Sequence, residues 1–240
     1  MSSSRFPGKP LLNIEGKTMI QHVWLRSKMC NKIDEVYIAT CDNEIKNEAE
    51  RFGAKVIMTR DDHEMCMERV CEASEKIESD IVVTIQGDEP LIHPDMIEKS
   101  INLLIQNRGF SATTLAQKIY NKKEIANTNR VKIIWKKNKE VIYISREPIP
   151  SKSKYKNEID YYKMVCVYAM RKKFLQEYNL LPKNKLEEIE SIDMLRIIEN
   201  NHKLGVEVID GVVENIDVES DISLVLNLMK NDDLYKRYKN

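Results

Sequence analysis

Long apolar runs are missing from this 240-residue sequence, and so is any excess of charge of one sign. Apolar runs such as residues 81–85 and 141–144 are far shorter than the roughly 20 residues that a membrane helix needs. Basic and acidic residues number 38 each, so no net field draws the chain to nucleic acid or an anionic membrane. We therefore expect a cytoplasmic protein with neither of these partners.

Glycine, proline and cysteine are also scarce. Seven glycines and seven prolines exclude a collagenous or low-complexity chain. The five cysteines are odd in number and form no CxxC pair, so we expect reduced thiols that pack as small hydrophobes. The remaining composition, 42% apolar and 32% charged, is sufficient for a sizeable core.

The first part of the chain alternates strand-like apolar runs with helical patterns. Strands are expected at 35–41, 54–58 and 81–85, and helices at 17–29, 43–52, 64–78 and 94–107. This order, with unbroken apolar strands, indicates a parallel sheet covered by helices. Ligands of such a sheet bind beyond the carboxyl ends of its strands.

The pattern changes from residue 111 onward. Shorter alternating strands at 111–117, 131–135, 140–146 and 164–170 suggest a small mixed or antiparallel lobe, roughly 111–170, that serves dimerisation or acts as a lid. Helices at 171–178, 186–200 and 220–229 and a strand at 206–209 follow. Because no long linker separates the parts, we predict a single α/β domain over 1–240.

The opening loop has the composition of a phosphate site. Arg5 and Lys9 bracket Pro7 and Gly8, and glycine permits a close approach of the backbone to an anion. A helical pattern follows, and helix starts favour phosphate. The loop is not a Walker motif, and an ordinary solvated basic turn is the alternative.

Acidic residues follow the apolar run 81–85 and precede the last predicted helix. Asp88 lies in Gln86-Gly-Asp-Glu-Pro90 at a strand end, where a carboxylate can hold a hard cation against a polyphosphate. Asp217 is a candidate second ligand. Their alternatives are a plain turn for Asp88 and a capping or turn residue for Asp217. His63 has no neighbours at ligand spacing, so a helix-start role is favoured there.

These segments together resemble one known family. The matching stretches are SRFPGKPL, GKTMIQHV, VYIATCDNEI, FGAKVIMTRDDHE, VVTIQGDEPLI, YISREPIP, LEEIESIDMLR and NIDVESD, in this order over nearly the whole chain. The family is that of the cytidylyltransferases that activate 3-deoxy-manno-octulosonate (Kdo) with CTP. The resemblance is specific because IQGDEPLI and RFPGKPL are both long and distinctive.

The resemblance implies a nucleotide-diphospho-sugar transferase-like fold, with a doubly wound, mostly parallel sheet. It also implies a homodimer that uses Mg²⁺, transfers CMP from CTP to the 2-hydroxyl of a sugar acid, releases pyrophosphate and feeds lipopolysaccharide biosynthesis. The implied residue roles are CTP binding by Ser3, Arg5, Lys9 and Arg69, catalysis by Lys9 and Asp88, metal binding by Asp88 and Asp217, and sugar-acid binding by Gln86, Arg146 and Glu190.

The departures from the family pattern concentrate around the acceptor. Small polar residues are replaced by Met65, Cys66 and Met67, a polar residue by Met194, and a histidine by Met164. Loss of polar partners would leave sugar hydroxyls unsatisfied at about 1 to 3 kcal/mol each. Two readings stay open. In the first, the pocket is altered and the acceptor is less hydroxylated than Kdo or is a phosphonate. In the second, the methionines pack behind an unchanged Kdo pocket.

A second departure lies at the start of the chain. Family members carry a hydrophobic strand ahead of the opening loop, whereas this sequence begins inside the loop. We expect either a start assigned too far downstream or a truncated product. A rival of another class is therefore an inactive relative that only binds nucleotide or forms dimers.

Overall fold

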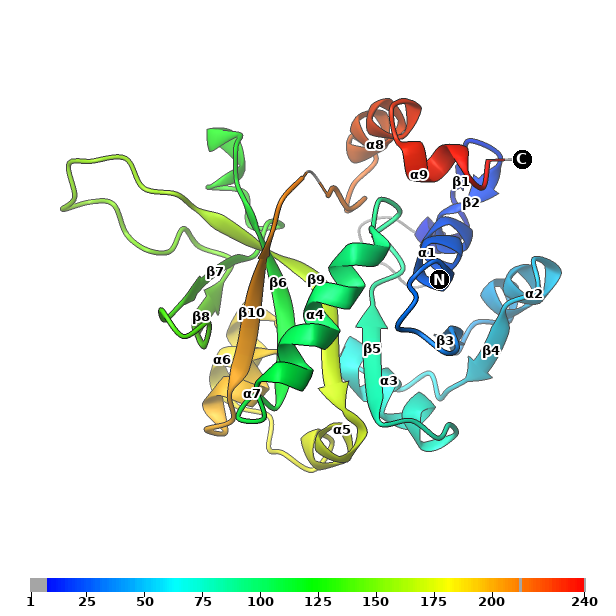
Figure 1. Cartoon of the computed structure of the whole chain (residues 1–240), viewed down its shortest axis with the longest axis horizontal. Coiled ribbons are helices and arrows are strands. Elements are labelled where there is room, and N and C mark those ends of the chain that lie inside the picture. Colours follow the sequence, from blue (N-terminus) through cyan, green and yellow to red (C-terminus); the bar gives the residue numbers. More distant parts are fainter. Residues whose placement is uncertain (1–7, 212, 240) are drawn as a thin grey trace. The chain divides into compact units, whose positions relative to one another are not determined.

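The structure, a computed structural model, describes residues 8–211 and 213–239 and comprises two compact units (Figure 1). The first unit contains the described residues of Met1–Glu78, Ile85–Glu98 and Val213–Asn240. The second contains Ser79–Thr84 and the described residues of Lys99–Val212. The lobe predicted at 111–170 lies wholly inside the second unit, which extends beyond it in both directions.

The first unit pairs a small parallel sheet with helices. Strands β3 (Tyr37–Thr40) and β4 (Lys55–Met58) are parallel neighbours, as the sequence predicts. The remaining elements are η1 (Lys9–Leu11), β1 (Asn13–Ile14), β2 (Lys17–Thr18), α1 (Met19–Lys28), α2 (Asn43–Arg51), α3 (Cys66–Glu75), α8 (Asp221–Lys230) and α9 (Asp233–Lys236).

Helix α2 shows why local sequence sets these boundaries. The Asp42 side chain accepts hydrogen bonds from the backbone N–H groups of Glu44 and Ile45, which caps the first turn. Gly53 takes a φ of 83° just after the helix, a conformation that glycine adopts without strain. The predicted helix at 43–52 is confirmed.

The predicted helix at 17–29 begins later than expected. Glu15 and Gly16 have φ values of 49° and 86° and form a tight turn between β1 and β2. Ile14 pairs with Lys17 across this hairpin. Two positive φ angles in a two-residue loop are typical of a turn that matches the twist of the strands, so residues 17 and 18 become strand and α1 starts at Met19.

The second unit is built on a mixed sheet. Its strands run in the order β10 (Leu204–Ile209), β6 (Ala112–Lys118), β9 (Tyr162–Arg171), β7 (Lys132–Trp135) and β8 (Val141–Ser145), and β5 (Ile81–Ile85) also pairs with β9. The β10–β6 pair is parallel, whereas β6–β9 and β7–β8 are antiparallel. The remaining elements are η2 (Lys122–Glu124), α5 (Lys172–Tyr178), α6 (Lys185–Glu190) and α7 (Leu195–Glu199), together with α4 (Pro94–Gln106), which begins in the first unit. The predicted α/β class with a mixed lobe is confirmed.

The predicted continuous helix at 186–200 is wrong. The structure has two helices, α6 and α7, separated by Ser191 in the left-handed region with a φ of 52°. The break allows Arg196 on α7 to form a buried ion pair with Glu187 on α6.

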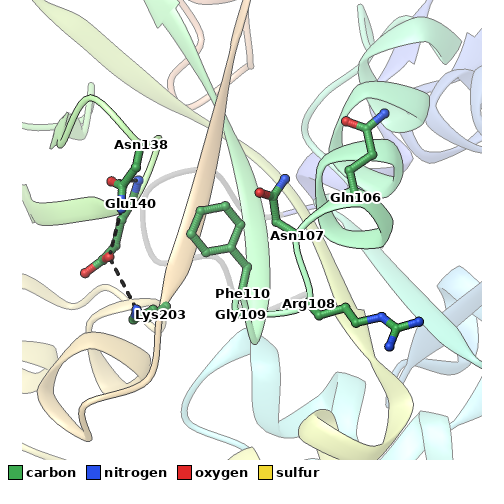
Figure 2. A pocket seen from close by; sticks show the side chains of 8 residues that line it. All are labelled: Gln106, Asn107, Arg108, Gly109, Phe110, Asn138, Glu140 and Lys203. Atoms are coloured by element: carbon green, nitrogen blue, oxygen red, sulfur yellow. Dashed lines mark hydrogen bonds and ion pairs between the residues drawn. The ribbon is translucent and has the colours of Figure 1, made fainter.

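A hollow of about 350 Å³ lies at one end of the second unit's sheet (Figure 2). Its lining consists of Gln106, Asn107, Arg108, Gly109, Phe110, Asn138, Glu140 and Lys203. The Phe110 ring is only 7% exposed and packs over Gly205, where a Cβ atom would lie 2.5 Å from a ring carbon. The absence of a side chain at residue 205 therefore makes room for the ring.

Gly205→Ala is expected to destabilise the protein by about 1 to 3 kcal/mol, because the buried ring has to shift to admit the methyl group. The matched control is Gly109→Ala in the same hollow, where a Cβ meets no atom within 4 Å. Urea unfolding of the two variants checks the prediction. Equal midpoints for the two would contradict it.

The helices and the cysteines bear on two expectations drawn from the composition. The helices among the described residues are all too short or too polar to cross a lipid bilayer. The five cysteines are thiols, and Cys30 and Cys71 are buried as predicted, whereas Cys66 is exposed and does not pack as a small hydrophobe.

Candidate active site

The basic loop begins with a glycine in the left-handed conformation. Gly8 has a φ of 73°, and its carbonyl accepts a hydrogen bond from the Leu11 N–H, closing the turn of η1. This turn directs Lys9 toward Asp88, and the ammonium lies 2.6 Å from Oδ2 of that carboxylate. Their side chains are only 12% and 16% exposed, so the pair is partly shielded from water.

One carboxylate oxygen of Asp88 has no donor within residues 8–211 and 213–239. Asp88 follows β5 in a turn in which the Glu89 N–H donates to the Gln86 carbonyl at 3.3 Å. Among the described residues, Oδ1 of Asp88 is buried and has no hydrogen-bond partner. A buried acceptor without a donor costs about 1 to 3 kcal/mol, so this oxygen is poised for a ligand.

Asp217 is brought to the same place by the backbone. The Ile216 N–H donates to the carbonyl of Asp88 at 3.1 Å, which fixes the segment 215–217 beside the QGDEP turn. Asn215 donates to Oδ2 of Asp217 at 2.7 Å, and the Asp217 N–H donates to Asp221 at 2.8 Å. The two aspartates that the sequence analysis selected thus come from adjacent segments of one unit.

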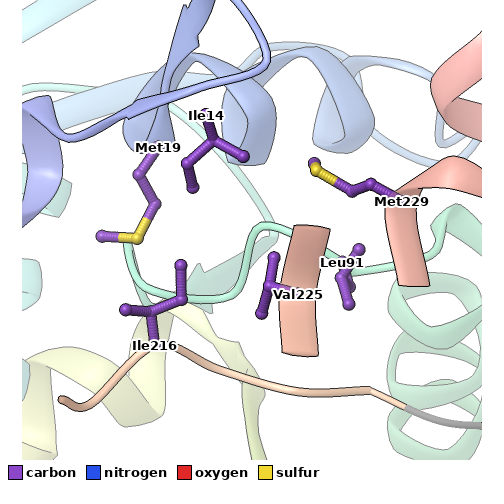
Figure 3. Packing of buried hydrophobic residues seen from close by; sticks show 6 residues of the cluster. All are labelled: Ile14, Met19, Leu91, Ile216, Val225 and Met229. Carbon is purple, nitrogen blue, oxygen red and sulfur yellow. The ribbon is translucent and has the colours of Figure 1, made fainter. Parts of the chain in front are cut away.

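A hydrophobic cluster supports all three segments (Figure 3). Ile14 follows the Lys9 loop, Leu91 follows Asp88, and Ile216 precedes Asp217. The full set of buried members is Ile14, Met19, Leu91, Ile216, Val225 and Met229, each at most 7% exposed. Because the segments share one packed core, their polar residues are held in a defined arrangement.

The donor set fits a hard divalent cation. Carboxylate oxygens are the protein ligands that Mg²⁺ prefers, and Mg²⁺ sites commonly use one or two carboxylates with substrate phosphates and waters. The described residues contain no group of three or more His, Cys, Asp or Glu side chains able to hold a metal. The unsatisfied Oδ1 of Asp88 is the observation that favours a cation here.

Of the other residues predicted to bind the substrates, the structure describes some and not others. Ser3 and Arg5 lie outside the described residues. Arg69 donates to Thr59 and to the Arg60 carbonyl, so its described bonds connect α3 to the segment after β4, not to the Lys9–Asp88 pair. Gln86 follows β5 directly, two residues before Asp88.

Arg146 and Glu190, predicted to face the sugar acid, bind each other in the second unit. The Arg146 side chain donates to the carbonyls of Glu190, Thr128 and Ser191 at 2.6, 3.0 and 3.1 Å. The Glu190 carboxylate accepts from the Arg146 N–H at 2.8 Å and from Ser145 at 2.7 Å. Both side chains therefore already have protein partners.

Sequence reasoning missed three residues of this second cluster, Tyr143, Ser145 and Lys132. Tyr143 donates to Glu190 at 3.3 Å, and burial with the nearby carboxylate raises the pKa of Tyr143. Lys132 is fully buried and donates to the carbonyls of Asn127 and Arg146, and burial lowers its pKa. Alternation in VIYIS, which puts Tyr143 and Ser145 on one strand face, was the available signal.

The residues that depart from the family pattern differ in exposure. Met67, Met194 and Met164 are 1%, 0% and 8% exposed, so they are core side chains. Met65 is half-buried and Cys66 is exposed at the start of α3. The burial of three of these five side chains favours the reading in which methionines pack behind the pocket.

The fold and the acidic site define an α/β nucleotidyltransferase, and comparison with known proteins makes the class specific. A family model described as Cytidylyltransferase matches residues 1–209. A 3-deoxy-manno-octulosonate cytidylyltransferase of Fusobacterium nucleatum is 39% identical over 97% of this chain and 95% of its own. An 8-amino-3,8-dideoxy-manno-octulosonate cytidylyltransferase of Shewanella pealeana is 36% identical, covering 92% of each chain.

A solved structure of CMP:2-keto-3-deoxy-manno-octonic acid synthetase in complex with CTP has the same fold. It superposes with a TM-score of 0.88 at 35% identity and covers 95% of this chain and 94% of its own. The chain belongs to the cytidylyltransferase family, and it is a nucleotidyltransferase enzyme of the 3-deoxy-manno-octulosonate type, as predicted.

Proposed function

We propose that this enzyme transfers CMP from CTP to the 2-hydroxyl of 3-deoxy-manno-octulosonate or its 8-amino analogue, with Mg²⁺ bound by Asp88 and Asp217. The observation that carries the metal assignment is Oδ1 of Asp88, which is buried and has no donor in the described part of the chain, while Oδ2 of the same carboxylate pairs with the Lys9 ammonium. The acceptor class is supported by relatives that cover nearly the whole chain.

Lys9 supplies positive charge where the triphosphate has to bind. A lysine ammonium carries three N–H donors, so Lys9 can keep Asp88 and still donate to a phosphate oxygen. As the 2-hydroxyl oxygen attacks the α-phosphorus, the bond from that phosphorus to the bridging oxygen of the β-phosphate breaks. Pyrophosphate leaves with the added negative charge, and the hydroxyl proton is released to solvent. Lys9 stabilises that charge, and bound Mg²⁺ would further neutralise the phosphates. Placement of the two substrates supplies the remaining acceleration, because no protein nucleophile is required.

Sugar-acid binding is assigned to Gln86, Arg146 and Glu190, and CTP binding to Ser3, Arg5, Lys9 and Arg69. The hydrogen bonds between Arg146 and Glu190 support a preformed polar surface rather than two mobile side chains. The assignment as a homodimer rests on the family resemblance alone. The reaction would take place in the cytoplasm and supply a donor for lipopolysaccharide.

An acceptor panel tests the function directly. Pyrophosphate release is measured with CTP, Mg²⁺ and each of 3-deoxy-manno-octulosonate, its 8-amino analogue and other 2-keto sugar acids. We expect the first two to give the highest kcat/KM, because relatives named for these two acceptors match over nearly the whole chain and Met67, Met164 and Met194 are buried. A clear preference for a less hydroxylated acid or a phosphonate would contradict this and favour an altered pocket at Met65 and Cys66.

A further inference from the structure

A buried polar network in the first unit connects α1 to Asp232 and Tyr238, one on either side of α9. His22 and Arg26 are four residues apart on α1, so their side chains lie on one face of the helix. They are only 0% and 1% exposed. Charged and polar groups are rarely buried so completely unless they are paired, and this pair has no assigned part in the reaction.

Tyr238 joins the two side chains. Its hydroxyl oxygen accepts from Nε of Arg26 at 2.7 Å and lies 3.0 Å from Nδ1 of His22. Nε2 of His22 lies 2.8 Å from the carbonyl of Ile14. A carbonyl only accepts, so Nε2 carries the proton, Nδ1 accepts, and the Tyr238 hydroxyl donates to it. Burial lowers the pKa of His22 to about 4, which keeps this neutral tautomer.

Arg26 forms a second arm of the network. Its Nη2 pairs with Asp232, which also caps α9 by accepting from the N–H groups of Leu234 and Tyr235. Its Nη1 donates to the carbonyl of Ile92 at 3.4 Å. The network therefore holds two backbone carbonyls, one on the chain that leaves the Lys9 loop, at Ile14, and one on the chain that leaves Asp88, at Ile92.

We infer that His22, Arg26 and Tyr238 are positioning residues for the nucleotide site, because they fix the Lys9 loop relative to the QGDEP turn. A fully connected buried polar network specifies one arrangement more sharply than apolar packing does. In the observed arrangement the Lys9 ammonium lies 2.6 Å from Asp88. The inference rests on the proposed function, in which Lys9 and Asp88 bind CTP and Mg²⁺.

Tyr238→Phe tests the inference with the smallest change. It removes the hydroxyl and leaves the Nε donor of Arg26 and the Nδ1 acceptor of His22 buried without their partner. We expect the Kd for CTP with Mg²⁺, measured calorimetrically without sugar acid, to rise about tenfold. The KM for CTP should rise in parallel, while the KM for the sugar acid stays within about twofold.

Two controls separate positioning from loss of stability. Tyr235→Phe removes a hydroxyl from the same C-terminal segment, one that donates to the Glu15 carbonyl at 3.3 Å near the surface. Ile45→Val trims a separate core cluster around Trp24 and Ile38. Both variants are expected to keep the wild-type Kd for CTP, even where the melting temperature of Ile45→Val falls as far as that of Tyr238→Phe.

A rescue pair at His22 gives a second readout. His22→Met removes the donor to Ile14 and should weaken CTP binding about tenfold, whereas His22→Gln retains an amide N–H for that carbonyl and should recover most of the affinity. Wild-type CTP affinity in Tyr238→Phe and His22→Met, or an equal loss for both substrates, would overturn the inference. Failure of the wild-type protein itself to bind CTP would overturn the proposed function as well.

Discussion

Asp88→Asn and Asp217→Asn are each expected to lower kcat by at least about a hundredfold while the protein remains folded. Loss of residues that only orient metal ligands already costs 10- to 100-fold, so loss of a ligand itself should cost more. The fold should persist because the backbone bond from Ile216 to the Asp88 carbonyl does not involve either carboxylate. Pyrophosphate release across a Mg²⁺ series, with both substrates saturating, measures the effect.

The control is Asp95→Asn, which neutralises a side chain that is 76% exposed in the same unit and should leave kcat unchanged. A second readout is independent of turnover: titration of Mn²⁺ in the presence of CTP, followed by electron paramagnetic resonance, should show a tightly bound ion only when both aspartates are present. Near-normal turnover of either variant at saturating Mg²⁺ would contradict the metal assignment.

The location of Asp88 was predictable, whereas its neighbours in space were not. The apolar run at 81–85 marks a strand, and a carboxylate just after such a strand lies at its carboxyl end. Asp217 follows no comparable signal, and long-range contacts of Ile216, a backbone bond to Asp88 and packing in the cluster that contains Leu91, bring it close. The family resemblance, not periodicity, linked the two aspartates.

The buried polar network of His22, Arg26 and Tyr238 could not be predicted from local sequence patterns. His22 sits on a short helix among apolar residues, which looks like an ordinary amphipathic face. Its partner Tyr238 is 216 residues further along the chain. Arg26 is only 1% exposed and pairs with Asp232, the residue that caps α9. The two residues are too far apart in the chain for a local sequence pattern to link them.

The break between α6 and α7 is explained by a buried ion pair. Arg196 donates to both carboxylate oxygens of Glu187, at 2.8 and 2.5 Å, and both side chains are 3% exposed. In one continuous helix, residues nine apart are rotated by about 900°, which places them on opposite faces. The left-handed Ser191 allows the chain to turn back so that the pair can form. The sequence around it contains neither Gly nor Pro, so the local signals favoured an unbroken helix.

Arg196→Met is expected to destabilise the protein by about 3 to 5 kcal/mol, because it leaves the buried Glu187 carboxylate without a counter-ion. For a chain of this size, that loss corresponds to a fall in Tm of roughly 6 to 20 °C. The side chain of Arg196 also lies over the Tyr178 ring at 4.8 Å, and methionine preserves much of that packing, so the charge is the main loss. Calorimetric unfolding measures the change.

The double variant Glu187→Leu with Arg196→Met separates the charge from the packing. Removing both members of a buried pair in favour of apolar side chains of similar size is often neutral, so the double variant should recover most of the lost Tm. Lys236→Met, which breaks an exposed pair with Asp233, should change stability by less than about 1 kcal/mol. Equal effects of Arg196→Met and Lys236→Met would show that the buried pair does not hold α6 against α7, and Glu190 at the end of α6 would then need another anchor.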